Sequence, residues 1–236
     1  MSRPFSRPAL YPHAVWYFLA ALALAVAGFF PSFFARLGAT DAGTVLHGVS
    51  AFAWLCLLAL QGWLIRRGER RWHRALGRAS WLIVLPLVGA GLVMVRAMVA
   101  GKTPFQQAFG PMLAWHDLTT LLYFLVAYGL AIHWRRHLHL HARLMATTAV
   151  LVLPPALSRL APMLLPGIDT FMEAYHAGMF AAEAVTLALI VHDLRRWRLW
   201  PPYPVLLGYF VLLHLSTPWI GAQPAWLAFC RWLAAL

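Results

Sequence analysis

Histidines are the residues of this sequence best suited to bind a cofactor or move protons, and four of the eleven recur in step. His47 and His73 are 26 positions apart (47 to 73), and His116 and His141 are 25 apart (116 to 141). In each pair a largely apolar run follows the first histidine, and a basic cluster surrounds the second. Because neutral imidazole is a common metal ligand, the recurrence predicts two histidine sites of similar construction.

The apolar runs between these histidines are long enough to cross a bilayer. Of the 236 residues, 62% are hydrophobic and only 11% are charged, against about 25% charged in a soluble domain. The composition therefore predicts one all-α integral membrane domain over residues 1–236, a bundle of about seven transmembrane helices with tandem hairpin repeats. The helices between about 44 and 164 form the expected cofactor core, and the first, sixth and seventh helices are peripheral. The expected spans are 13–35, 44–65, 79–100, 112–134, 144–163, 173–191 and 205–220.

Basic residues give the formal charge of +12, and they fall in short loops between apolar runs. This placement indicates topology signals rather than a nucleic-acid surface. It predicts a multi-pass protein of a bacterial-type plasma membrane with a cytoplasmic N-terminus and a retained first helix. The side expected to be cytoplasmic holds Arg3, Arg7, Arg66, Arg67, Arg70, Arg71, Arg74, Arg78, Arg135, Arg136, Arg143, Arg195, Arg196 and Arg198. The other side holds Arg36, Lys102 and Arg231.

This topology sorts the histidines by depth. His47, His116 and His176 fall near the outer ends of their helices, His73 and His141 fall near the inner ends, and His214 lies within the last helix with no assigned role. Polar residues follow at spacings of four, seven or fourteen, which keeps them on one helical face. Because polar side chains in lipid turn toward the bundle interior, these faces are expected to point inward. The polar residues are Gln61, Thr120, Tyr123, Met145, Thr148 and Glu183.

Bis-histidine haem ligation requires one imidazole from each of two neighbouring helices at equal depth. The second and fourth helices run in the same direction, so His47 and His116 are level. The third and fifth run in the other direction, so His73 and His141 are level as well. The sequence thus predicts one or two b-type haems. Candidate cations for the haem propionates are Arg74 and Arg143 inside, and Arg96, Lys102 and Arg159 outside. Candidate glycines for a flat macrocycle are Gly48, Gly62, Gly77, Gly89, Gly91 and Gly129.

This arrangement resembles the transmembrane di-haem cytochrome b-561 family. The resemblance rests on His47-Gly48, Gln61, His73-Arg74, Leu76-Gly77 and the Gly89–Leu92 stretch, and covers about residues 44–164. The His-Arg-x-Leu-Gly pattern also resembles a group of uncharacterised bacterial membrane proteins. The resemblance implies that His47, His116, His73 and His141 ligate haem and that the protein carries electrons across the membrane. The chain departs from the family pattern in its seventh helix and in a third outer histidine, His176.

A metal site is the main alternative. His47, His116 and His176 share the outer layer, and three imidazoles with a water form an open catalytic zinc site. This would suit a membrane-embedded hydrolase, although the spaced His-x-x-x-His of such families is missing from the last helix. A transporter or assembly factor without a cofactor is the third possibility. No dinucleotide motif is present, so an electron partner would be a quinone, another protein or a small diffusible reductant. Cys56 and Cys230 predict neither a disulfide framework nor a zinc motif.

Overall fold

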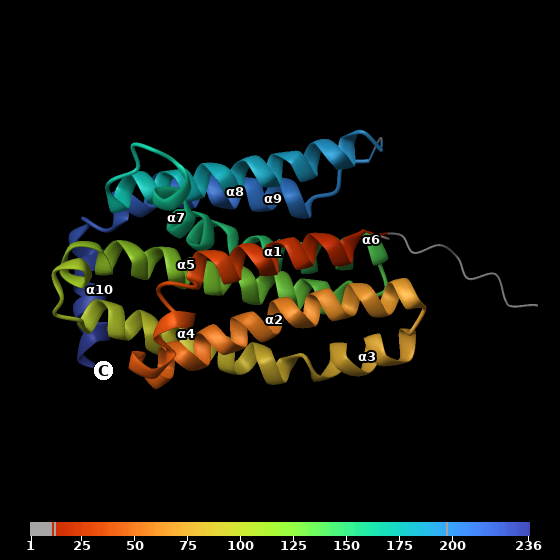
Figure 1. Cartoon of the computed structure of the whole chain (residues 1–236), viewed down its shortest axis with the longest axis horizontal. Helices are drawn as coiled ribbons and strands as arrows, with labels where there is room; N and C mark the ends of the chain where they lie inside the picture. The colour runs from red at the N-terminus through yellow and green to blue at the C-terminus, as the bar shows by residue number, and fades with distance from the viewer. Residues whose placement is uncertain (1–10, 12, 197) are drawn as a thin grey trace, which may run out of the picture.

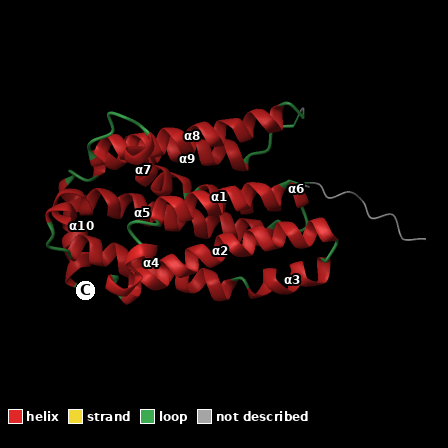
Figure 2. Ribbon diagram, viewed as in Figure 1, coloured by secondary structure: helices red, strands yellow, loops and turns green. Residues whose placement is uncertain are grey.

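The described part of the chain is helical throughout, as its composition predicts. The computed structural model describes Tyr11, residues 13–196 and residues 198–236, and Figure 2 shows helices and loops over these residues without a strand. Arg3 and Arg7, expected on the cytoplasmic side, lie outside the described residues. In chain order the elements are α1 (Ala14–Phe29), η1 (Phe34–Ala39), α2 (Ala42–Arg67), α3 (Arg70–Ala79), α4 (Trp81–Ala100), α5 (Pro104–His133), α6 (Leu138–Val150), α7 (Leu153–Leu164), α8 (Phe171–Leu194), α9 (Pro202–Ile220) and α10 (Pro224–Ala235).

Six helical segments of the described chain are long and apolar enough to cross a membrane, so the multi-pass character is supported. The first of the seven expected spans is not among these six segments. Its helix, α1, has 16 residues and is about 24 Å long at 1.5 Å per residue, less than the roughly 30 Å hydrocarbon core. The helix stops just before Pro31, which lacks the backbone N–H that a helix interior needs. The six long segments are Ala42–Arg67, Arg70–Ala100, Pro104–His133, Leu138–Leu164, Phe171–Leu194 and Pro202–Ile220.

Two of these segments are each built from two helices. The basic stretch expected as a loop after α2 is instead α3, which continues into α4 at Ser80. The Ser80 hydroxyl donates to the Gly77 carbonyl at 2.7 Å and lies 2.8 Å from the Tyr128 hydroxyl, which ties this junction to α5. The segment Leu138–Leu164 is divided just before Pro154, because α6 ends at Val150 and α7 begins at Leu153.

Local sequence sets the helix ends. Asp41 caps α2, with its carboxylate accepting the Thr44 N–H at 2.9 Å. Hydrogen bonding by Thr44, through its side chain and then its backbone, lowers the pKa of Asp41. Gly68 ends α2 in the left-handed conformation (φ 79°), a backbone geometry that favours glycine. Thr103 and Thr170 form capping boxes at the starts of α5 and α8, where side-chain oxygens satisfy backbone N–H groups that lack an intrahelical partner.

The helices form an elongated bundle whose two ends differ in charge. The α2–α3 turn, the start of α6 and the α8–α9 loop gather at one end, on the right of Figure 1, while the α4–α5 loop and α10 lie at the opposite end. The first end holds most of the arginines, including Arg66, Arg67, Arg70, Arg71, Arg135, Arg136, Arg195 and Arg196, and is called here the arginine-rich end.

Aromatic packing joins the helices at mid-depth. Trp54 of α2 packs edge-on against Phe124 and Tyr128 of α5 at centroid distances of 5.3 and 5.6 Å. Its indole N–H donates to the Thr148 hydroxyl of α6 at 3.1 Å. The expectation that Thr148 faces inward is therefore confirmed. Large apolar side chains such as Leu212 (70% exposed) and Leu215 (72%) cover the outside, as lipid-facing positions would.

Candidate functional site

His73 and His141 come together at the arginine-rich end of the bundle. His73 lies on α3 and His141 on α6, and their ring centroids are 6.3 Å apart with the planes at 85°. Both side chains are half-buried. The amphipathic α3 makes this approach possible, because it turns back along the bundle after the left-handed Gly68. The sequence-based expectation that these two histidines are level is met by their ring contact.

Hydrogen bonding leaves one nitrogen of His141 open. Its Nδ1 lies 2.8 Å from the Ala131 carbonyl, and because a carbonyl only accepts, Nδ1 carries the hydrogen and Nε2 keeps a free lone pair. Metal-binding histidines are commonly oriented by such a bond to a backbone carbonyl. Gln61 donates from Nε2 to the His73 backbone carbonyl at 3.2 Å, which fixes the adjoining turn of α3 against α2.

Two buried polar atoms beside this pair have no partner within the described protein. They are His73 Nδ1 and Gln61 Oε1. Buried polar atoms are almost always hydrogen-bonded, so both point to a group beyond the protein atoms. Gly77 adjoins them, and a Cβ there would meet only Gln61 Nε2, at 3.7 Å. The absence of a side chain at Gly77 thus leaves room next to the pair.

The spacing of this pair fits two axial ligands of one iron. Imidazoles that bind a metal from opposite sides stand about 6 Å apart between centroids, since each metal–nitrogen bond is about 2 Å and each centroid lies about 1 Å behind its nitrogen. The observed separation of His73 and His141 is 6.3 Å. Two neutral imidazoles on different helices form the donor set that haem b takes, so the residues at this end suit the cofactor.

The structure does not bring His47 and His116 together in the same way. His47 Nδ1 lies 2.9 Å from the Leu87 carbonyl of α4. Gly91 permits this, because a Cβ there would stand 3.0 Å from that Nδ1. His116 is buried and packs edge-on against Tyr175 of α8 at 5.8 Å. Among the described residues no ring contact or hydrogen bond joins His47 to His116, so a shared outer site stays a prediction.

His176, the third outer histidine, belongs to a hydrogen-bonded chain with His214 and Glu183. His176 Nδ1 lies 2.8 Å from His214 Nε2, and His214 Nδ1 lies 2.9 Å from Glu183 Oε1. Tyr175 touches both imidazoles, at centroid distances of 5.5 and 5.8 Å. The inward face shared by His176 and Glu183 was predicted from their spacing of seven, but His214 had no assigned role.

The position of His214 follows from antiparallel pairing of α8 and α9. Glu183 lies 11 residues before Leu194, where α8 ends, and His214 lies 12 residues after Pro202, where α9 begins. Residues equally far from the connecting loop of an antiparallel helix pair come level with each other. The histidine–glutamate contact was therefore within reach of sequence reasoning, whereas the ring contact of His116 with Tyr175 carried no such signal.

Arg143, an expected partner of the haem propionates, is instead committed to Asp193. Its Nε and Nη2 donate to the two carboxylate oxygens at 2.6 and 2.7 Å, and both residues are buried. A planar guanidinium matches a carboxylate in this two-bond geometry. The guanidinium also lies over the Trp200 ring at 5.4 Å and donates to the Tyr11 hydroxyl. Burial raises the pKa of Tyr11, although the charge of Arg143 opposes this.

The other cations and glycines expected at a haem site differ in whether neighbouring protein groups already occupy them. Arg74 is exposed on α3, one residue after His73. Arg159 donates to the Pro155 carbonyl at 2.8 Å and lies over Phe29 at 4.4 Å. Among the glycines, Gly48 and Gly62 are closed off by Phe33 and Val15, while Gly89 and Gly129 have nothing within 4 Å of an added Cβ.

A three-histidine zinc site finds no support in this geometry. Within the described residues no group of three or more histidine, cysteine, aspartate or glutamate side chains converges as metal ligands. His176 turns to His214 and Glu183 instead of joining His47 and His116. Cys56 and Cys230 are free thiols. Comparisons with family models, curated proteins and solved structures found no match for this chain.

Proposed function

We propose that this chain is a membrane b-type cytochrome-like protein that moves electrons through one or two bis-histidine haems. The observation that carries the proposal is the pairing of His73 and His141 at 6.3 Å between ring centroids, from two helices far apart in sequence. Two further features support it: the carbonyl-bonded Nδ1 of His141 and the unpartnered polar atoms of His73 and Gln61. The haem b that these residues would hold is a one-electron carrier.

Each protein group near the pair has a distinct part in this proposal. His73 and His141 would ligate the iron through Nε2, and the bond to the Ala131 carbonyl would raise the basicity of His141. The exposed guanidinium of Arg74 offers hydrogen-bond donors for anionic groups of the cofactor, and Gln61 Nε2 holds the His73 carbonyl. Arg143 does not take this part, because Asp193 already neutralises it.

A second haem on His47 and His116 belongs to the proposal in its two-haem form. His47 shares with His141 an Nδ1 bonded to a backbone carbonyl, and His116 shares with His73 a buried Nδ1 without a described partner. Each pair therefore joins one carbonyl-bonded imidazole with one imidazole whose Nδ1 has no described partner. Electrons would then pass between the two ends of the bundle, with a quinone, a redox protein or a diffusible reductant as partner.

The proposal is tested by a dithionite-reduced minus oxidised absorption spectrum of the purified protein, with haem quantified as its pyridine complex. One or two haems per chain are expected. Colourless protein from haem-replete cells would contradict the proposal. Stoichiometric zinc in that colourless protein would favour the hydrolase alternative, and the lack of both would favour a transporter or assembly factor.

A further inference from the structure

Residues of α8 and α9 line a pocket of about 380 Å³ at the level of the His176–His214–Glu183 chain, which extends from the buried His214 to the exposed Leu215. His176 lies five residues from the start of α8 and His214 six residues from the end of α9, about 7 to 9 Å along each helix. The pocket is therefore within the membrane-spanning part, in the half away from the arginine-rich end. Its lining is His176, Phe180, Glu183, Val211, His214, Leu215 and Pro218.

The hydrogen-bonded chain gives this pocket a defined polarity. The premise of the inference is that Glu183 is a carboxylate and His214 a neutral imidazole; the carboxylate only accepts, so His214 Nδ1 then carries the hydrogen and His214 Nε2 is bare. The bare Nε2 in turn accepts from His176 Nδ1. Both bonds are short, at 2.9 and 2.8 Å. His176, which lines the pocket, is then left with Nε2 as a lone-pair acceptor at the end of the chain.

The mouth of the pocket is apolar and open. Phe180 is 62% exposed and Leu215 is 72% exposed, and in a spanning helix pair such side chains face lipid. Phe180 also packs edge-on against His214 at 4.8 Å, which gives the pocket an aromatic wall. A ligand that reaches His176 must therefore arrive through the bilayer and offer an apolar, ring-compatible body.

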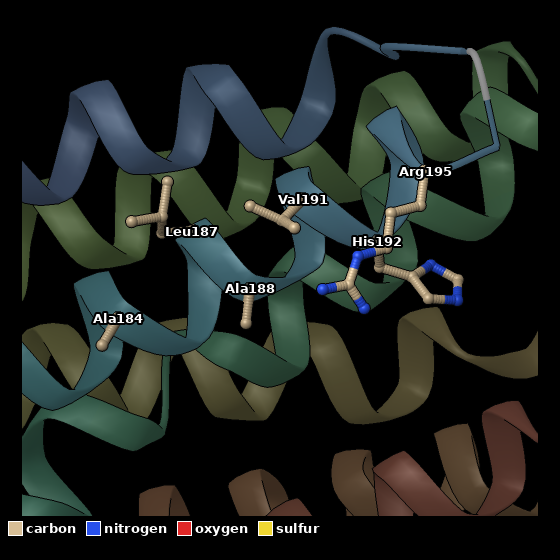
Figure 3. Close-up of a pocket in the computed structure, with 6 residues that line it drawn as sticks. All are labelled: Ala184, Leu187, Ala188, Val191, His192 and Arg195. Carbon is tan, nitrogen blue, oxygen red and sulfur yellow. The ribbon is translucent and has the colours of Figure 1, made fainter.

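A second pocket on the same helix lacks this construction. It has a similar volume, about 370 Å³, and is lined by Ala184, Leu187, Ala188 and Val191, with His192 and Arg195 at one end (Figure 3). The His192 side chain is half exposed, and its contact in the described protein is a 4.0 Å approach to Asp193. Since no chain of hydrogen bonds fixes a ring nitrogen of His192, this pocket is a matched comparison within one helix.

We infer that the α8–α9 pocket binds a lipid-soluble phenol-class molecule, whose hydroxyl donates a hydrogen bond to His176 Nε2. The acceptor end of the chain selects a hydroxyl over an ether or a carbonyl, since only the hydroxyl can donate. The open apolar mouth selects a molecule that partitions into lipid, and the Phe180 wall favours an aromatic ring. Glu183 acts as a positioning residue, because it holds the tautomers of His214 and His176. The inference does not depend on haem binding.

The test is titration calorimetry of the protein in lipid nanodiscs with nonylphenol and its methyl ether, using empty nanodiscs as blanks. The phenol is expected to bind about three- to tenfold more tightly than the ether, the range of one net hydrogen bond. In His176→Phe, which keeps an aromatic side chain, this preference should vanish. In His192→Phe it should persist, because that residue lines the other pocket.

The ligand comparison stands by itself if His176→Phe does not fold. Equal binding of the phenol and the ether to the wild-type protein would overturn the inference, as would an equal loss of preference in His192→Phe. An aliphatic alcohol of the same length that binds as tightly as nonylphenol would overturn the inference that the Phe180 wall favours an aromatic ring. A full phenol preference in a haem-free preparation would uphold this site even where the proposed function fails.

Discussion

The two ends of the bundle carry the same histidine pattern but different degrees of assembly. At the arginine-rich end His73 and His141 meet at 6.3 Å, while at the opposite end His47 and His116 engage other partners, the Leu87 carbonyl and the Tyr175 ring. In each pair one Nδ1 binds a carbonyl, and the other is buried without a described partner. The comparison teaches that each end holds one carbonyl-bonded and one unpartnered Nδ1, whereas the rings meet only at the arginine-rich end.

The arginine-rich end also has the stronger scaffold. Arg143 and Asp193 clamp α6 to α8 two residues beyond His141. Trp200 covers the guanidinium. At the opposite end the contacts around His116 are edge-on aromatic contacts and packing. A buried two-bond ion pair resists displacement more than such contacts do, because an unpaired buried charge is costly.

The largest effect on stability is expected from Asp193→Ala. It leaves Arg143 buried and unpaired, which costs about 3–5 kcal/mol. His141 lies on the same helix as Arg143, so the haem proposed for this end should also be bound more weakly. Thermal melting in detergent measures the effect, with the exposed Arg196→Ala as the matched control. An Asp193→Ala protein that melts together with the control would show that the ion pair does not fix this end.

Replacing the outer histidines separates the two pairs. His47→Ala and His116→Ala should leave unchanged the spectral component that the proposal ascribes to His73 and His141, since neither residue contacts that pair. If a second haem is bound, both variants should lose the same component, because a bis-histidine iron needs both ligands. Difference spectra of the two variants, recorded per mole of protein, give the answer. If either variant lost the spectral component proposed for His73 and His141, the two ends of the bundle would not be independent sites.

The orientation of the inner rings predicts a magnetic signature. The imidazole planes of His73 and His141 stand at 85°. Perpendicular axial imidazoles give ferric haem a highly anisotropic low-spin signal, whereas parallel planes give a rhombic one. If haem is bound between these rings as proposed, low-temperature electron paramagnetic resonance of the oxidised protein should show the anisotropic form. A purely rhombic spectrum, with its full intensity removed by His73→Ala, would contradict this geometry.

The smallest effect concerns the cap of α2, the helix that carries His47. The lowered pKa of Asp41 means that its carboxylate stabilises the fold above the unfolded value of about 4,. This contribution is lost as pH falls through the folded pKa. Asp41→Ala should cost about 0.5 kcal/mol near pH 7 because the site is exposed, and less at about pH 3. Melting at both values measures it, and an equal cost at both would disprove a charge-based cap.

The sequence predicted the helical class, the apolar spans and the level placement of His73 and His141, because these follow from hydropathy and helix direction. It did not predict that the arginine-rich stretch before Ser80 forms the helix α3, because a dense cluster of basic residues between two apolar runs is typical of a loop. It also assigned Arg143 to a cofactor, because the partner, Asp193, lies 50 residues away. Such long-range pairing depends on how helices pack sideways, which hydropathy does not encode.

The most direct test of the central claim is the haem content of His73→Ala and His141→Ala beside that of His137→Ala. His137 is an exposed histidine at the same end of the bundle, so its replacement controls for general loss of charge and folding. The account predicts that the first two variants lose the same reduced-minus-oxidised component, while His137→Ala keeps the full wild-type spectrum. A folded His73→Ala or His141→Ala protein with full haem content would contradict the assignment of these two histidines as ligands of one iron.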